Sequence, residues 1–202
     1  GRSICQGCST GCNAYLDFDP RDNTPYRYRP RDNEAVNGYW MCDEGMLSYP
    51  EAYEGRLTTA LVGADDATVV EALDAAKRQM SGHGDDPSKL AIVLWARHSL
   101  EDNFALALVA KQYMSVDQVF VARRPDGEGD DILMRADKNS NTAGVKQVCE
   151  LVGLPEPRPM SELVTALEDK KILYLVSLGE DIDVDEAALR SAASGLKGFV
   201  AI

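Results

Sequence analysis

Two features that would direct a protein to a membrane or to nucleic acid are missing from the sequence. No apolar run reaches the ~18 residues that a transmembrane helix needs, so we expect no direct membrane span. Basic residues are in the minority: 21 Lys and Arg stand against 33 Asp and Glu, for a formal net charge of −12. Because phosphate binding draws on a surplus of Lys and Arg, we also expect no nucleic-acid partner.

The sequence offers little material for acid–base or nucleophilic catalysis. It has only two histidines, His83 in a polar Gly/Asp loop and His98 at the end of an apolar run. A single histidine in such a place is usually a surface or capping group, so neither is assigned as a ligand. We find no nucleophile–base combination. The sequence therefore predicts no catalytic residue.

Cysteine is scarce but concentrated. Three of the five cysteines fall in the segment C-Q-G-C-S-T-G-C at 5–12, and the pattern is Cys5-x2-Cys8-x3-Cys12-x29-Cys42, with Cys149 left over. A disulfide between Cys5 and Cys8 would be cramped, and an intracellular chain would keep both thiols reduced. Zinc is a stronger alternative, although structural zinc sites usually take their ligands as two pairs.

A grouping of three plus one suits a [4Fe–4S] cluster better. Each of its four irons needs one thiolate, so a tight loop can bind three of them and a distant cysteine the fourth. Gly7 and Gly11 stand between the ligands, where a chain curling around a bulky core needs positive φ and no Cβ. The spacing favours a cluster, and zinc remains the alternative.

Cys149 has a simpler interpretation. In V-K-Q-V-C-E-L-V-G it shares one helical face with Val145, Val148 and Val152. Free cysteine is among the most often buried residues. We predict a structural thiol in a hydrophobic core.

The chain changes character near residue 57. Before that point it is rich in Gly, Pro, Asn, Asp, Tyr and Arg, and only short strands and turns fit, such as A-Y-L-D-F (14–18) and Y-R-Y-R (26–29). After that point apolar runs alternate with segments of helical period. The predicted strands are 89–96, 116–122, 170–178 and 198–202, and the predicted helices start at caps Thr68, Ser99 and Asp183 or cover 143–152 and 161–168.

Repetition of strand and helix predicts a parallel sheet with helices on its faces. The expected fold class is therefore α/β: a small cysteine-rich β/loop iron–sulfur subdomain at 1–57, followed by a Rossmann-like parallel-sheet domain at 58–202. The last predicted strand runs into the end of the chain at Ile202. We expect this domain to be truncated there and the chain to be part of a longer polypeptide.

Two segments carry a family resemblance. S-I-C-Q-G-C-S-T-G-C-N (3–13) and R-P-R-D-N-E-A-V-N-G-Y-W-M-C-D-E-G (29–45) resemble the iron–sulfur segment that opens the molybdopterin oxidoreductase module, and more closely the G subunit of bacterial NADH:quinone oxidoreductase, respiratory complex I. A-D-K-N-S-N-T-A-G (136–144) resembles a loop of the same module. Residues 58–202 would then be a partial molybdopterin-oxidoreductase-like α/β domain.

The resemblance implies a function and a ligand set. It implies that Cys5, Cys8, Cys12 and Cys42 hold one [4Fe–4S] cluster that transfers electrons. It also implies other peripheral-arm subunits of a respiratory complex as partners, a location at the cytoplasmic face of the inner membrane through that complex, and no activity for this chain alone.

Two departures argue against a bound molybdopterin. The related molybdenum enzymes usually place Lys or Arg two residues after the fourth cysteine, where this chain has Glu44, next to Asp43. The loop 179–183, G-E-D-I-D, would face a pyrophosphate with three carboxylates, and no G-x-G-x-x-G is present. The alternative function is the amino-terminal part of a molybdopterin-dependent formate dehydrogenase or nitrate reductase-like enzyme. A zinc-stabilised interaction module is the third.

Two further features have two interpretations each. Arg27, Arg29 and Arg31 either offset the charge of a cluster or an acidic partner, or form the solvated edge of a small sheet. Trp40 either shields a cluster from water or belongs to a core.

Overall fold

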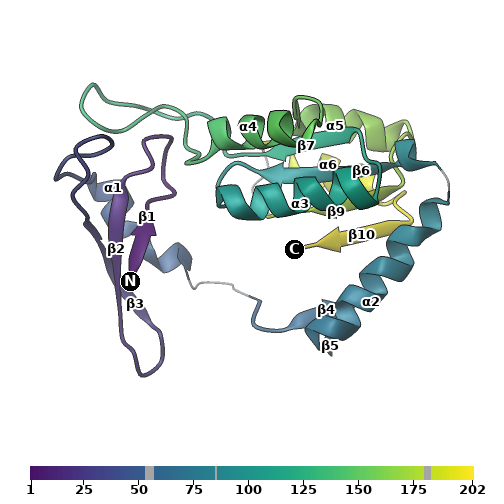
Figure 1. Cartoon of the computed structure of the whole chain (residues 1–202), viewed down its shortest axis with the longest axis horizontal. Helices are drawn as coiled ribbons and strands as arrows, with labels where there is room; N and C mark the ends of the chain where they lie inside the picture. Colours follow the sequence, from purple (N-terminus) through teal and green to yellow (C-terminus); the bar gives the residue numbers. More distant parts are fainter. Residues whose placement is uncertain (53–56, 85, 180–182) are drawn as a thin grey trace. The chain divides into compact units, whose positions relative to one another are not determined.

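The computed structural model describes residues 1–52, 57–84, 86–179 and 183–202 (Figure 1). The chain divides into two compact units. The first comprises Gly1–Thr58 and Arg124–Asn141, and the second comprises Thr59–Arg123 and Thr142–Ile202. The composition change near residue 57 gave no sign that residues 124–141 return to the first unit. The two functional labels, cluster binding and molybdopterin-like, stay predictions.

The first unit is built on a three-stranded antiparallel sheet in the order β1-β2-β3. Ile4 pairs with Asn13 and Leu16 with Tyr28, so the sheet ends where the cysteine loop begins. The strands at 14–18 and 26–29 were predicted, whereas the first strand was not. The elements of this unit are β1 (Arg2–Ile4), β2 (Asn13–Phe18), β3 (Pro25–Pro30), α1 (Asp43–Leu47) and the 3-10 helix η1 (Tyr49–Ala52).

The second unit contains a five-stranded sheet in the order β10-β9-β6-β7-β8, and all neighbouring strands are parallel. This confirms the α/β fold class. The first strand of this sheet in chain order, β6, lies at its centre, and the chain then adds β7 and β8 on one side and β9 and β10 on the other. The strands are β6 (Leu90–Trp95), β7 (Gln118–Ala122), β8 (Arg158–Pro159), β9 (Tyr174–Ser177) and β10 (Gly198–Ala201), and a separate hairpin is formed by β4 (Ala60–Val62) and β5 (Asp65–Ala67).

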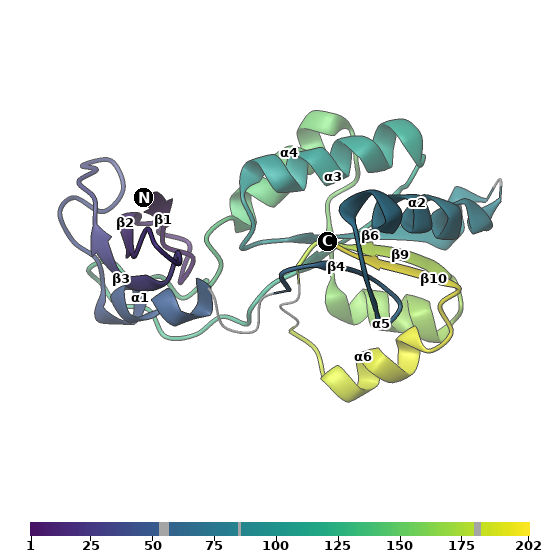
Figure 2. The ribbon, with the colours of Figure 1, turned by 90° about the horizontal axis from the view of Figure 1, so that it is seen from below.

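Helices cover both faces of the parallel sheet. Figure 2 shows α3 and α4 on one face and α5 and α6 on the other. Alternate residues of β6 explain this: Ile92 packs in a cluster with Val145 of α4, while Val93 packs in a cluster with Leu163 of α5. The helices are α2 (Val69–Met80), α3 (Leu100–Tyr113), α4 (Thr142–Val152), α5 (Met160–Glu168) and α6 (Glu186–Ala193), with 3-10 turns η2 (Ser81–His83) and η3 (Pro87–Lys89).

Helix starts follow the capping signals in two of three places. Thr68 caps α2 in a full capping box with Glu71, and the Ser99 side chain accepts from the amide of Asp102 at the start of α3. The third prediction was wrong, because Asp185 and not Asp183 caps α6. Two acidic residues stand two positions apart there, and the sequence alone does not choose between them.

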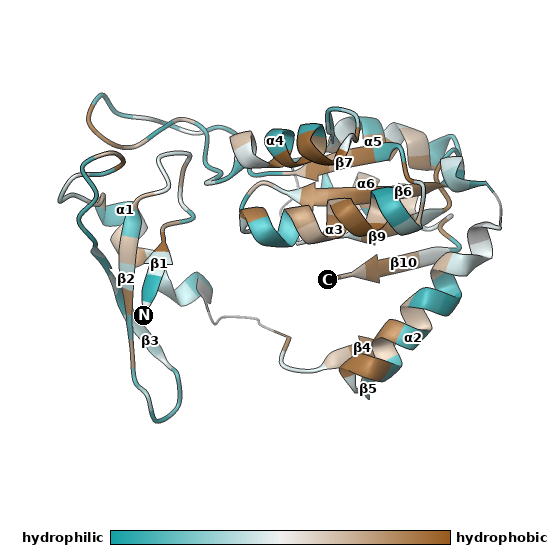
Figure 3. Ribbon diagram, viewed as in Figure 1, coloured by the Kyte–Doolittle hydropathy of each residue, from teal (hydrophilic) through white to brown (hydrophobic). Residues whose placement is uncertain are grey.

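Helix α2 differs from the expected pattern of burial. Val69, Val70, Leu73 and Met80 recur on one helical face of the sequence, yet the first three are each more than 60% exposed and only Met80 is buried. Figure 3 colours the first turn of α2 as hydrophobic, like the central strands of the sheet.

None of the helices in the described parts of the chain combines the length and apolar character that crossing a membrane requires.

Candidate metal centre

The loop between β1 and β2 carries three of the four cysteines that the sequence singled out. The amide of Cys5 donates to the carbonyl of Cys12 at 2.8 Å, and the amide of Gly11 donates to the carbonyl of Cys8 at 3.1 Å. Gly11 has a φ of 60°, which glycine adopts without a steric penalty. All three cysteines are less than 10% exposed. The loop therefore curls back on itself with its thiols facing inward.

Asn37 brings the fourth cysteine toward this loop. Its side-chain oxygen accepts from the amide of Asn13 at 2.9 Å, directly after Cys12, and its side-chain nitrogen donates to the carbonyl of Trp40 at 2.9 Å. Asn37 is 4% exposed. One buried side chain thus ties the turn before Cys42 to the first residue of β2. This accounts for the V-N-G-Y segment in physical terms.

The four thiols line one pocket of the first unit. Gly45 is one of its lining residues: a Cβ added there would lie 3.0 Å from the Sγ of Cys5 and 3.4 Å from that of Cys42. The pocket is lined by Cys5, Gly7, Cys8, Cys12, Cys42, Glu44, Gly45, Leu133, Met134 and Lys138. Residues that are 30 positions apart in the sequence therefore converge, as the predicted ligand set requires.

The opposite wall comes from the segment 124–141, which the sequence analysis did not assign to the site. The carboxylate of Asp130 accepts from the amides of Leu133 at 2.6 Å and Met134 at 2.8 Å, which fixes this turn. The hydroxyl of Thr10 in the cysteine loop donates to the carbonyl of Leu133 at 2.5 Å. No spacing signal in the sequence could have found this wall, since it depends on contacts across more than 100 residues.

Hydrogen bonds also hold the A-D-K-N-S-N part of the segment 124–141 against the cysteine loop. The amide of Ser9 donates to the carbonyl of Asp137 at 2.8 Å. Asn139 is fully buried, accepts from the amide of Arg124 at 2.7 Å and donates to its carbonyl at 2.9 Å. This loop resembled one in the related module, and in this chain it packs on the cysteine loop.

The electrostatics of the pocket disfavour an ionised Cys12 thiol. Burial, together with the charge that the three other thiols acquire as they ionise, raises the pKa of the Cys12 thiol to about 12. All five cysteines are reduced and none is in a disulfide. Four thiolates in one pocket repel each other, whereas a metal centre deprotonates its thiols outright and holds them together. The amides of Gly7 and Gly45 donate to the sulfurs of Cys5 and Cys42 at 3.4 and 3.3 Å.

The described residues hold no group of three or more His, Cys, Asp or Glu side chains arranged around a single metal ion. Thiolates on one zinc would lie about 3.8 Å apart, given a Zn–S bond of about 2.3 Å. A [4Fe–4S] cluster gives each thiolate its own iron and so needs sulfurs that are farther apart. The free space between the thiols is about 10 Å³, the room of about one water molecule. The donor set fits a cluster, and its uptake would part the thiols.

The remaining cysteine lies in the second unit. Cys149 is 1% exposed and packs in the hydrophobic cluster that contains Val145 and Val148. Burial raises its pKa to about 11. These are the properties of the structural thiol that the helical pattern predicted.

The arginines of β3 and Trp40 each had two interpretations from the sequence. Arg27 and Arg29 both pair with Asp17, at 2.9 and 2.7 Å, on the exposed edge of the sheet. They therefore offset a local carboxylate. Trp40 is 73% exposed, so it is not a core residue of this unit. The core interpretation from the sequence was wrong, because aromatic character does not decide which way a turn residue points, and the shielding role stays a prediction.

The carboxyl end of the parallel sheet is the second place where a cofactor could be sought. In parallel sheets, ligands bind beyond the strand ends where the strand order reverses, here between β6 and β9. Trp95 ends β6, and Gly179 follows β9. A Cβ added to Gly179, whose φ is 81°, would lie 2.0 Å from the Trp95 ring. The indole therefore lies directly on this backbone, next to the point where the strand order reverses.

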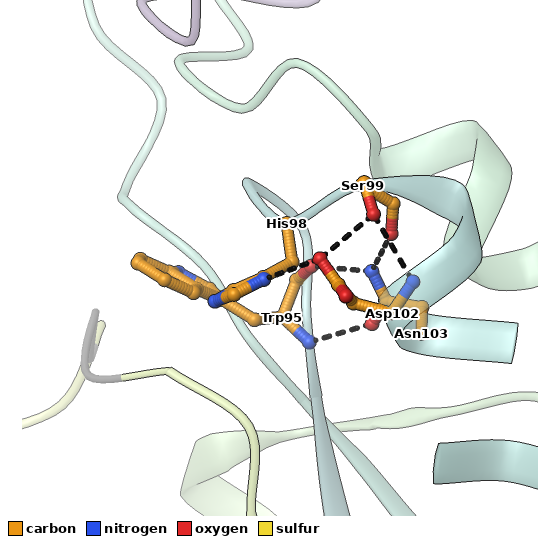
Figure 4. Close-up of polar contacts among 5 residues, drawn as sticks. All are labelled: Trp95, His98, Ser99, Asp102 and Asn103. Atoms are coloured by element: carbon orange, nitrogen blue, oxygen red, sulfur yellow. Dashed lines mark hydrogen bonds and ion pairs between the residues drawn. The ribbon is translucent and has the colours of Figure 1, made fainter. Parts of the chain in front are cut away.

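The residues after Trp95 complete this arrangement (Figure 4). The His98 ring lies 4.5 Å from the Trp95 ring, and its Nδ1 is 3.1 Å from the carboxylate of Asp102. Ser99 donates to the same carboxylate at 2.7 Å. His98 thus takes part in the hydrogen bonds at the start of α3, as expected for a capping group at a strand end.

Residues 180–182 of the acidic loop 179–183, and the side chain of His83, lie outside what the structure describes.

Comparison with known proteins identifies similar sequences but no matching family model. The chain is 32% identical over 108 residues, 52% of its length, to the G subunit of the NADH-quinone oxidoreductase of Pseudomonas fluorescens, of which this covers 11%. It is 28% identical over 121 residues, 57% of its length, to the protein of the same name from Buchnera aphidicola subsp. Baizongia pistaciae, of which this covers 13%. The chain thus matches little more than a tenth of the length of each relative. Both names agree with the resemblance found in the cysteine segments.

Proposed function

We propose that Cys5, Cys8, Cys12 and Cys42 bind one [4Fe–4S] cluster, and that the chain is an electron-transfer segment of a protein like the G subunit of NADH-quinone oxidoreductase. The observation that carries the proposal is the convergence of these four thiols, from two separate segments, on one pocket. The names of the two relatives support it independently.

Each part of the pocket has a role in this proposal. A bound cluster would supply one-electron redox chemistry. The four thiolates hold it, and the amides of Gly7 and Gly45 donate to sulfur, which stabilises negative charge on the ligands. Leu133 and Met134 cover the pocket with apolar surface. None of these residues needs to move a proton.

The second unit is proposed to be a molybdopterin-type domain that holds no pterin. The contact of Trp95 with Gly179 supports this, because the indole packs on the backbone next to the point where the strand order reverses. By analogy with the relatives, the partners would be other peripheral-arm subunits of a respiratory complex. The chain would then lie at the cytoplasmic face of the inner membrane and have no activity alone.

Anaerobic reconstitution tests the proposal. Given iron and sulfide, the wild-type chain is expected to take up four of each, to absorb visible light, and to give an EPR signal when reduced. Cys42→Ser should reduce cluster yield more than tenfold, whereas Cys149→Ser, its matched control in the second unit, should leave the yield unchanged. A colourless protein that contains zinc and no iron would contradict the proposal and favour the zinc-stabilised module.

A further inference from the structure

A lysine from a distant segment lies at the thiol pocket. Lys138 lines the pocket together with the four cysteines, and its side chain is only 15% exposed. Its ammonium lies 3.9 Å from the carboxylate of Glu44, which is 64% exposed. The cation is therefore on the shielded side of this ion pair, and the carboxylate is on the side that faces water.

The backbone around Lys138 holds this position. A Cβ on Gly127 would lie 2.8 Å from the Cε of Lys138, so the lysine stem packs closely on the backbone of Gly127. The amide of Gly127 donates to the carbonyl of Ala136 at 2.9 Å. The neighbours of Lys138 on both sides, Asp137 and the buried Asn139, are fixed by the hydrogen bonds described above.

The charge of Lys138 acts on a pocket that has few other charged residues. Among the described residues that line it, Lys138 is the cation and Glu44 is the carboxylate, and the rest are cysteine, glycine, leucine or methionine. Ordinary screening by water is reduced for a charge that is mostly buried, so the field of Lys138 acts on the sulfurs more strongly than that of exposed Glu44. A positive charge there stabilises any added electron.

We infer that Lys138 sets the charge balance at the thiol pocket and raises the reduction potential of the cluster, while Glu44 opposes it. This rests on the proposed function. Lys138 acts through space as a tuning residue and not as a ligand, because the four thiols complete the ligand set. The sequence placed an acidic residue, Glu44, close after the last ligand, and the structure adds a cation from 94 positions further on.

Redox titration of the reconstituted chain, followed by EPR, tests the inference. Lys138→Met keeps the length of the stem and removes the charge. Lys138→Arg keeps the charge. Lys171→Met makes the same change of net charge in the second unit, at a lysine that is 70% exposed and pairs with Asp169. Glu44→Gln removes the opposing charge.

We expect Lys138→Met to lower the equilibrium constant for one-electron reduction about tenfold, a shift of about 59 mV to lower potential. Lys138→Arg and Lys171→Met should stay within twofold of wild type, and Glu44→Gln should shift the potential upward. A Lys138→Met cluster with wild-type potential overturns the inference and leaves the proposed function standing.

Two other outcomes are also decisive. If Lys138→Met takes up no cluster, Glu44→Gln decides the matter: an upward shift supports the inference, and an unchanged potential overturns it. A wild-type chain that takes up neither iron nor sulfide overturns the proposed function, and this inference with it.

Discussion

The two units of this protein are stabilised by different means. The second unit has two hydrophobic clusters on either side of a sheet whose central strand, β6, is almost fully buried from Leu90 to Leu94. The first unit has one small cluster, and two of its four buried members, Cys5 and Cys12, are proposed ligands. Small units with little core usually depend on a metal or on disulfides. In our proposal the first unit depends on its cluster in this way, and buried polar side chains such as Asn37 and Asn139 add to its stability.

The largest effect that tests this comparison is expected at Gly179. Gly179→Ala forces a Cβ to within 2.0 Å of the Trp95 ring at a positive φ, so we expect the second unit to lose about 3–5 kcal/mol of stability. Hydrogen exchange read by mass spectrometry would localise the loss to this unit. Gly153→Ala is the control, since its φ is 74° but nothing lies within 4 Å of the added Cβ. Equal losses in the two variants would mean that the contact with Trp95 does not matter.

The next largest effects on stability are expected at two buried asparagines, one in each unit. Asn37 in the first unit and Asn103 in the second each accept from a backbone amide and donate to backbone carbonyls. Replacing either by Ala leaves buried backbone groups without partners, at about 2–3 kcal/mol. Asn37→Ala should reduce cluster uptake and leave the unfolding of the second unit unchanged, and Asn103→Ala should do the reverse. Thermal unfolding and iron content, measured on both variants, check this. Loss of cluster in both would show that the units are not independent.

The smallest effect is expected from acid. Arg29 and Arg27 hold the pKa of Asp17 well below its usual range in the first unit, so its carboxylate stabilises the fold above pH ~4 and this contribution fades as the pH falls further. Such exposed pairs contribute at most about 1 kcal/mol. Asp17→Asn should flatten the stability of the first unit between pH 5 and 3, as measured by hydrogen exchange.

In the second unit the matching group is Asp102, whose pKa is lowered by hydrogen bonds from Ser99 and His98. Its contribution has the same sign, so it too is lost as the pH falls through the acidic range. Asp102→Asn should therefore change the acid response of the second unit alone. A change in the first unit would contradict the division of the chain into two units.

Local signals in the sequence predicted much of this structure. The run K-L-A-I-V-L-W-A gives the buried central strand, and Thr68-x-x-Glu71 gives a full capping box, because both depend on neighbours in the chain. The two-residue strand β8, Arg158–Pro159, could not be predicted, since it is too short for periodicity and ends in a proline. Cys42 lines the same pocket as the other three cysteines, and the ligand role of the four stays a prediction.

The rest of the site depends on contacts that no local pattern encodes. Leu133, Met134 and Lys138 reach the pocket because one segment leaves the second unit between β7 and α4. Hydrophobic or charged residues in an irregular segment are common, so nothing marks these three in advance. Similarity of A-D-K-N-S-N-T-A-G to a related loop was the available hint, and it did not show where the loop packs.

The long separation between Thr10 and Leu133, 123 positions along the chain, has a consequence for how the protein is made. At a synthesis rate of about 5–20 residues per second, the cysteine loop leaves the ribosome some 6–25 s before the segment that covers it. During that interval the thiols are open to oxidants and to adventitious ions. Faithful maturation would then require either that delivery of iron and sulfide waits for the second half of the chain, or that a chaperone guards the nascent thiols until it arrives.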